Sequence, residues 1–153
     1  MGKNISNNDL KRVYNLIEGS RKKYGNLKKC EFHLHTPASH DYELIKDKNY
    51  NQLSIEEILE FSVEIGYLNK GNKDFLLKEV EEYKSNKYVE TLRESNKPYS
   101  SFKEYIAYMN IAHKLYQENI EVVFISDHNT VSGFHKLKYA LNEYYVERIK
   151  ITE

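Results

Sequence analysis

Residues 32–42 read FHLHTPASHDY, and they complete an apolar segment that we expect to form a strand over residues 27–35. The histidines His33 and His35 stand two positions apart in this strand. Side chains two positions apart project from the same face of a strand, so both imidazoles can reach one point beside the sheet. This spacing is typical of two ligands of one metal ion.

The turn after this pair offers a third ligand. His40 and Asp41 lie in a segment that contains Pro37 and Ser39, where the chain can fold back toward the pair. We expect Thr36 and Ser39 to act as turn hydroxyls rather than as nucleophiles, because the sequence supplies no triad around them.

A second polar stretch follows another short apolar run. Residues 121–125 read EVVFI, which predicts a buried strand, and residues 125–133 read ISDHNTVSG. Asp127 and His128 therefore come directly after the carboxyl end of this strand. In α/β folds, that edge of the sheet is where ligands bind.

These two stretches resemble a known family. The pattern HxHTPASxDY, followed later by a strand ending in SDHNTVSG, resembles the first two motifs of the PHP family, the polymerase and histidinol phosphatase domains. The resemblance covers residues 28–42 and 120–141. It implies a distorted, seven-stranded β/α barrel of the TIM-like type. It also implies a centre of two or three metal ions that hydrolyses phosphate esters.

The resemblance further implies roles for individual residues. His33 and His35 correspond to paired ligands of one ion, and His128 corresponds to a ligand from the second motif. For the ligand from the first loop we expect Asp41, with His40 as the alternative. Histidine and carboxylate ligands suit zinc, manganese or iron, and these divalent transition metal ions are the expected cofactors.

Asp127 is the candidate catalytic residue of the second motif. We expect it either to orient His128 or to cap the turn that follows, and we favour the first role. In the intact family the ions activate water and neutralise charge in an in-line displacement, so no side-chain nucleophile is required. The expected substrates are phosphate monoesters or diesters, including nucleotides and nucleic-acid ends.

The chain departs from the family pattern after its second motif. PHP domains usually add a glutamate from a third strand, further histidines and a late Asp-x-His, whereas this sequence has no histidine after His135. We therefore expect residues 1–153 to be the amino-terminal part of a PHP domain, an incomplete α/β barrel fragment. Residues 149–153 would open the next strand. Such a chain is a truncated product, an expressed fragment, or one piece of a split protein that a partner chain or self-association completes.

Helical patterns separate the two motifs. Residues 43–98 are charged and helical, and we expect an insertion that leaves the barrel as a solvated excursion. Capping boxes are expected at Ser54 and Ser101, and Thr130 is expected to cap the last helix. The expected helices span residues 9–24, 54–65, 73–95, 101 to about 115, and 130 to about 146.

Composition excludes few classes of function. The 23 Lys and Arg residues balance 23 Asp and Glu residues, so no global basic field recruits nucleic acid. Cys30 is the single cysteine and cannot form an internal disulfide, which fits a reducing compartment. No apolar run has the length of a membrane span, and the first residues lack the apolar core of a signal peptide. We expect a soluble, cytoplasmic protein.

Two functions follow from these patterns. The first is a metal-dependent phosphoesterase whose remaining ligands come from a carboxyl-terminal half or a partner chain. The alternative is a catalytically incomplete PHP remnant that acts as an interaction module. The TPAS form of the first loop resembles PHP domains joined to coiled-coil or AAA-type ATPases in nucleic-acid processing and phage defence. We expect His113 and His135, which lie within predicted helices, not to be ligands.

Overall fold

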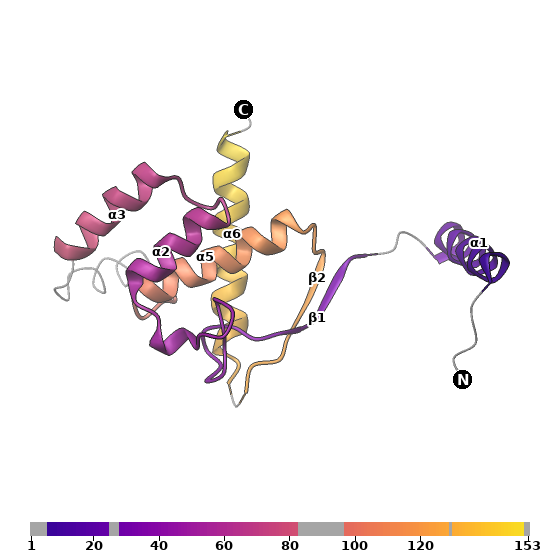
Figure 1. Cartoon of the computed structure of the whole chain (residues 1–153), viewed down its shortest axis with the longest axis horizontal. Helices are drawn as coiled ribbons and strands as arrows, with labels where there is room; N and C mark the ends of the chain where they lie inside the picture. Colours follow the sequence, from indigo (N-terminus) through magenta and orange to yellow (C-terminus); the bar gives the residue numbers. More distant parts are fainter. Residues whose placement is uncertain (1–5, 25–27, 83–96, 129, 152–153) are drawn as a thin grey trace.

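The computed structural model describes residues 6–24, 28–82, 97–128 and 130–151 (Figure 1). Most of its elements are helices, and each of the two polar motifs follows one of two short strands. In chain order the elements are α1 (Asn7–Tyr24), β1 (Cys30–Leu34), the 3-10 helix η1 (Tyr50–Gln52), α2 (Ile55–Glu64), α3 (Lys70–Glu82), α5 (Phe102–Gln117), β2 (Val122–Ile125) and α6 (Ser132–Ile151).

The strands β1 and β2 pair in a parallel, two-stranded sheet. Glu31 lies opposite Val123 and Leu34 lies opposite Ile125, so β1 uses one residue more than β2 over the same stretch. Such a bulge bends the strand and changes the direction of the side chains around it, here at the start of the first polar motif, in the stretch that contains His33. Because the strands are parallel, both motifs leave the sheet at the same edge.

The expected incomplete, distorted β/α barrel of the TIM-like type is wrong for the part of the chain that the structure describes. The described residues are mostly helical, and their two parallel strands form one sheet rather than a section of a barrel. Residues 149–151, which were expected to open a further strand, continue α6 as a helix. No glycine or proline interrupts the sequence from Phe134 to Ile151, so no local signal ends the helix earlier.

The core lies around α5, which packs against α2 and α6. The side chains of Ile58 and Leu59 in α2, Tyr108 and Met109 in α5, and Leu137 in α6 are at most 1% exposed. The α2 helix lies within the segment that was expected to be a solvated insertion. That expectation is wrong for α2, because its apolar face supplies part of the core.

Local capping sets where the core helices begin. The side chain of Ser54 accepts from the backbone N–H of Glu57, whose carboxylate accepts from the backbone N–H of Ser54, and this confirms the predicted capping box of α2. Ser101 caps α5 in the same way by accepting from the N–H of Glu104. The carboxylate of Glu104, however, binds the N–H and hydroxyl of Ser100. The second box is therefore only half formed.

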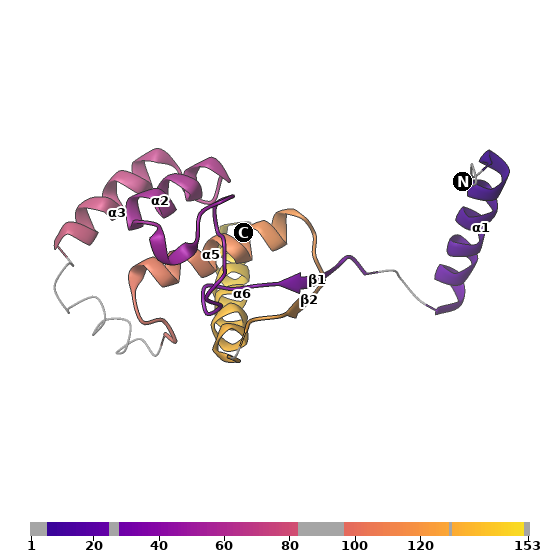
Figure 2. The ribbon, with the colours of Figure 1, turned by 60° about the horizontal axis from the view of Figure 1, so that its bottom comes forward.

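The α1 helix stands apart from the other elements (Figures 1 and 2). Its apolar residues Leu10, Val13, Leu16 and Ile17 remain exposed, by 47% for Ile17 and by 63% for Leu16. The predicted helix at residues 9–24 is confirmed, but none of these apolar side chains belongs to the described core. Within the described parts of the chain, no helix is both long enough and apolar enough to cross a membrane.

Candidate metal centre

The loops after β1 and β2 meet at the carboxyl edge of the sheet. The backbone N–H of Ser126 donates to the carbonyl of Leu34 at 2.9 Å, which extends the pairing just past the strands. The first loop then turns back at once, because the N–H of Ser39 donates to the carbonyl of Thr36 at 2.8 Å. The two polar motifs are therefore held side by side, as their positions after two strands predicted.

Three side chains converge between these loops. The Nδ1 atom of His35 lies 3.1 Å from Oδ1 of Asp41, and Nε2 of His128 lies 3.2 Å from Oδ2 of the same carboxylate. One possible ligand atom from each of the three residues lies within 4.8 Å of the others. The side chain of His35 is 17% exposed, whereas those of Asp41 and His128 are 40% and 50% exposed. The cluster is thus mostly buried at His35 and open to solvent at Asp41 and His128.

The arrangement suits a divalent transition metal ion. In a tetrahedral site with metal–ligand distances of about 2.1 Å, neighbouring ligand atoms lie about 3.4 Å apart. The two contacts of Asp41 are close to that spacing. In addition, Nε2 of His35 is buried and has no hydrogen-bond partner among the described residues. Since Nδ1 is the ring nitrogen that faces Asp41, an ion held beside Asp41 and His128 would be bound through Nδ1, and Nε2 would stay on the far side of the ring.

The electrostatics of the cluster keep Asp41 ionised. Its pKa is lowered to about 2, chiefly because the hydroxyl of Ser39 donates a hydrogen bond to Oδ1 at 2.6 Å. Desolvation acts in the opposite direction, while the backbone N–H of Asp41 and the nearby His35 and His128 lower the pKa further. Two imidazoles beside one ionised carboxylate form a donor set that zinc, manganese and iron accept.

His33 and His40 border this cluster. The ring centroid of His33 lies 4.7 Å from that of His35, and the ring centroid of His40 lies 5.5 Å from that of His128. Both His33 and His40 are exposed. The structure thus gathers all five predicted ligands in one place, with His35, Asp41 and His128 at its centre.

Asp127 contacts the first loop. Its Oδ1 accepts from the backbone N–H of Thr36 at 2.6 Å, and its Oδ2 accepts from the hydroxyl of Thr36 at 2.7 Å. Among the described residues, this carboxylate therefore hydrogen-bonds to the residue after His35, whereas the sequence analysis offered an orienting contact with His128 or a cap of the following turn. A catalytic role for Asp127 stays a prediction.

Several residues near the cluster are more buried and make more contacts between the two loops than the sequence indicated. Thr36 and Ser39 were expected to be turn hydroxyls, yet they are 0% and 2% exposed and bind groups of both loops. Tyr108 reaches the same place from α5, with its hydroxyl 3.0 Å from Oγ1 of Thr36. At Gly133, an added β-carbon would lie only 1.8 Å from Oδ2 of Asp127. The sequence signal that could have identified Gly133 is a glycine in the first turn of a helix, where another helix former is normally better.

The other two histidines lie outside the cluster. His113 is buried in α5, where its ring nitrogens contact the hydroxyl of Tyr144 at 2.8 Å and the carbonyl of Ile65 at 3.0 Å. His135 is exposed on α6, and its ring packs against that of Phe134. His113 therefore joins α5 to α6 and to the end of α2, and His135 is a surface residue.

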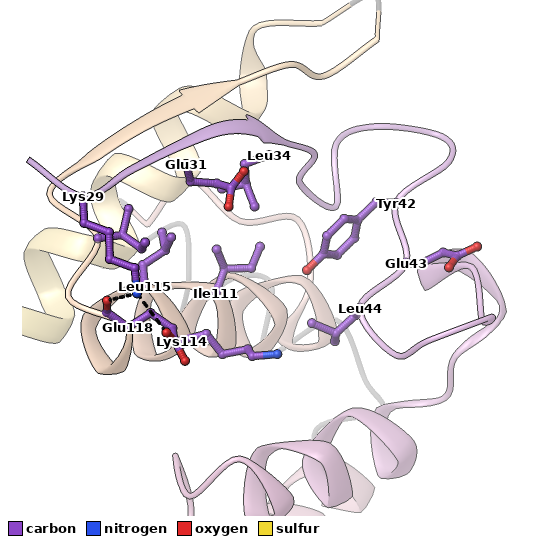
Figure 3. A pocket seen from close by; sticks show the side chains of 11 residues that line it. Lys29, Glu31, Leu34, Tyr42, Glu43, Leu44, Ile111, Lys114, Leu115 and Glu118 are labelled. Atoms are coloured by element: carbon purple, nitrogen blue, oxygen red, sulfur yellow. Dashed lines mark hydrogen bonds and ion pairs between the residues drawn. The ribbon is translucent and has the colours of Figure 1, made fainter. Parts of the chain in front are cut away.

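A separate hollow of about 430 Å³ lies between β1 and α5 (Figure 3). Ile111 and Leu115 form part of its apolar wall, and Tyr42 lines it from the first loop. At its rim Lys29 donates to the backbone carbonyl of Glu118 at 2.7 Å and to its carboxylate at 3.0 Å. None of the five candidate ligands lines this hollow, so it is distinct from the candidate metal centre.

Comparison with known proteins gives one sequence relative and no described activity. An uncharacterized protein of Streptococcus pneumoniae serotype 4 is 31% identical over 139 residues, which cover 89% of this chain and 48% of that protein. The chain thus spans about half the length of the curated relative that it matches. No family model and no solved structure matches the chain. The resemblance to the PHP family therefore stays a prediction.

Proposed function

We propose that this protein is a metal-dependent phosphoesterase of the PHP type. The observation that most supports the proposal is the convergence of His35, Asp41 and His128 on one point. These residues come from two motifs that are far apart in the sequence, and they are ligands that the resemblance predicts. A carboxylate between two imidazoles, on the open edge of a parallel sheet, is suited to bind a metal ion within reach of a substrate.

In this proposal, His35, Asp41 and His128 hold the ion, with His33 beside them. The close contacts of Asp41 with both imidazoles favour it over His40 as the ligand from the first loop. A bound ion would lower the pKa of a water molecule and neutralise charge on the phosphoryl group. The solvent-open side of the cluster admits a phosphate monoester or diester, including a nucleotide or a nucleic-acid end.

Full activity in this proposal requires further ligands. Three protein ligands hold one ion and leave an open position, whereas phosphoesterases with two ions need additional ligands to hold the second. We propose that a carboxyl-terminal segment or a partner chain supplies them. About half of the relative's length lies outside the region that matches this chain, and that part could contain such ligands.

Metal content is the first test. The purified chain is incubated with Zn²⁺ or Mn²⁺, passed through size exclusion and examined by elemental analysis. We expect about one transition metal ion per chain, lost in the variants His35→Ala and His128→Ala. The control variant His135→Ala removes an exposed histidine outside the cluster and should keep the metal. Equal metal content in all four proteins would contradict the proposal.

Hydrolysis is the second test. The chain is assayed with 4-nitrophenyl phosphate and bis(4-nitrophenyl) phosphate, alone and fused to the part of the relative outside the matched region. We expect release of 4-nitrophenol that depends on Zn²⁺, Mn²⁺ or Fe²⁺ and is abolished by His128→Ala. A fusion that binds metal but hydrolyses neither ester would exclude this activity on simple phosphate esters.

An exposed apolar pair favours the second candidate function, an interaction module. Phe32 of β1 is 71% exposed and Phe124 of β2 is 50% exposed, and their rings stack with centroids 5.0 Å apart. A parallel sheet is normally covered on both faces, and unpaired strand edges promote association. If association is the function, Phe124→Ser should yield monomers in light scattering, whereas His33→Ala should leave the oligomeric state unchanged. A wild-type chain that is monomeric at every concentration would count against this candidate.

A further inference from the structure

The strongest connection between the two loops is a carboxylate bound by one residue. Both oxygens of Asp127 accept from Thr36, one from its backbone N–H at 2.6 Å and one from its hydroxyl at 2.7 Å. Thr36 follows His35 directly and Asp127 precedes His128 directly. This bidentate contact therefore joins the residues next to two of the central ligands.

A second connection between the two loops is made by a serine hydroxyl of the first loop. The hydroxyl of Ser39 donates to Oδ1 of Asp41 at 2.6 Å and accepts from the backbone N–H of His128 at 3.3 Å. Ser39 belongs to the first loop and is 2% exposed, so water does not compete for its hydroxyl. The same side chain therefore orients the carboxylate ligand and fixes the backbone of a histidine ligand.

The neighbours of Thr36 determine which hydrogen bonds its hydroxyl donates and which it accepts. Its single hydroxyl proton is donated to Asp127, so Tyr108, whose hydroxyl lies 3.0 Å away, must be the donor to Thr36. Burial raises the pKa of Tyr108 well above its ordinary value, and this keeps the donated proton on the tyrosine. The chain of hydrogen bonds therefore runs from Tyr108 through Thr36 to Asp127.

Gly133 packs against the Asp127 carboxylate and the Thr36 hydroxyl. A β-carbon at this position would lie 1.8 Å from Oδ2 of Asp127 and 2.3 Å from Oγ1 of Thr36. The first turn of α6 thus packs directly on the bound carboxylate. A helix amino terminus favours an anion at this position, which adds to the stability of the contact.

We infer that Thr36, Ser39 and Asp127 form a clasp whose role is to set the spacing of His35, Asp41 and His128. This inference rests on the proposed function for its metal. It makes Asp127 a positioning residue that acts through Thr36, rather than a catalytic residue that touches the substrate. Outer hydrogen-bond partners of metal ligands typically contribute about 10-fold to 100-fold to metal affinity. We expect a loss of that size when the clasp is opened.

Two substitutions at Thr36 separate hydrogen bonding from packing. Thr36→Val keeps the volume and the backbone N–H but removes the hydroxyl, whereas Thr36→Ser keeps the hydroxyl and removes a methyl group. Asp127→Asn removes the negative charge and keeps the shape. Ser54→Ala is the matched control, because it removes a helix cap of α2 outside the clasp.

The measurement is titration of each protein with Co²⁺, followed by the visible absorption of the bound ion, which reports coordination geometry. We expect Thr36→Val and Asp127→Asn to bind Co²⁺ at least about 10-fold more weakly and with an altered spectrum. Thr36→Ser and Ser54→Ala should bind it as the wild type does. Wild-type affinity and spectrum in Thr36→Val and Asp127→Asn would overturn the inference, and so would a loss in Thr36→Ser that exceeds the loss in Thr36→Val.

Nuclear magnetic resonance of the metal-free proteins separates failure of the clasp from failure of the proposed function. The Thr36 amide proton, bound at short range to a carboxylate, should resonate far downfield in the wild type and move upfield in Asp127→Asn. If the clasp is present, that substitution also moves the ring signals of His35. A wild type that binds no Co²⁺ but shows both shifts would remove the proposed function and keep the clasp. Unmoved His35 signals would overturn the clasp with or without metal.

Discussion

Substitution of Gly133 by alanine tests the contact between α6 and the two loops. The new β-carbon would lie 1.8 Å from Oδ2 of Asp127 and 2.3 Å from Oγ1 of Thr36, whereas real β-carbon contacts essentially never fall below 3.0 Å. To restore an ordinary contact from 1.8 Å, the carboxylate must therefore move away from the new β-carbon by more than about 1 Å. Such a movement is enough to break its hydrogen bonds of 2.6 and 2.7 Å to Thr36.

The expected cost follows from those two hydrogen bonds. A hydrogen bond to a charged group contributes about 1.5–3 kcal/mol, so losing both costs about 3–6 kcal/mol. Alanine is the better helix former by about 1 kcal/mol, which offsets part of that loss. We expect Gly133→Ala to lower the free energy of unfolding by about 2–5 kcal/mol. With a slope of about 2 kcal/mol per molar urea, the urea midpoint should fall by about 1–2.5 M.

Urea unfolding followed by circular dichroism measures this change, and two further proteins control it. Gly19→Ala adds a β-carbon with nothing within 4 Å in α1, so its midpoint should stay the same or rise. In an Asp127→Ala background, part of the cost of Gly133→Ala should disappear, because the obstructing carboxylate is gone while Oγ1 of Thr36 still lies 2.3 Å from the new β-carbon. A Gly133→Ala protein as stable as the wild type would refute the reasoning, as would an equal cost in both backgrounds.

Three shorter predictions concern other residues. The pKa of the Glu57 carboxyl is lowered because Lys48 and the backbone N–H of Ser54 donate hydrogen bonds to it. The ionised carboxylate therefore stabilises the fold above its unfolded pKa of about 4.5, and this stabilisation is lost as the pH falls. Glu57→Gln should cost more stability at pH 7 than at pH 3 in urea titrations, and an equal cost at both pH values would contradict this. His113→Phe removes the hydrogen bonds of the imidazole with the hydroxyl of Tyr144 and with the carbonyl of Ile65, and it should cost about 1–3 kcal/mol in the same assay with Co²⁺ affinity unchanged, whereas lost Co²⁺ binding in the folded protein would make His113 part of the metal site. Asp41→Asn should weaken Co²⁺ binding at least about 10-fold, because the carboxylate charge between two imidazoles is removed, and unchanged affinity in a Co²⁺ titration would exclude Asp41 as a ligand.

Much of the local structure could be predicted because its causes are local. The capping box from Ser54 to Glu57 forms as expected, since both of its hydrogen bonds lie within one helical turn. The strand before His128 was expected at residues 121–125 and is observed at Val122–Ile125, since a short β-branched and aromatic run between polar residues is a strong strand signal. The closeness of the two motifs also follows from such reasoning, because parallel strands end at one edge of their sheet.

Other features could not be predicted because they depend on distant partners. The alternation of Ile149 and Ile151 with a lysine matches a strand as well as the end of a helix, and the uninterrupted α6 decides in favour of the helix. The box expected at Ser101 is half formed because Glu104 binds both Ser100 and Lys136, and Lys136 belongs to α6. The contact of Asp127 with Thr36 likewise needs the register of two loops that no local pattern sets. The barrel expectation was wrong for a related reason, since it extended two motifs to a topology that the described residues do not form.

The ligand count bears on which chemistry the described residues can support. His35, Asp41 and His128 make three ligands, which is the number that holds a single catalytic zinc ion and leaves one position open. His33 and His40 lie next to opposite members of this group, at 4.7 Å from His35 and 5.5 Å from His128 between ring centroids. Since they flank different histidines, they do not by themselves form a second group of three. The described residues therefore offer candidate ligands for one ion, and a two-ion mechanism depends on ligands beyond those that they gather. Metal analysis at saturation distinguishes these cases, because one ion per chain fits the first and two ions per chain would require a second site that His33 or His40 helps to build.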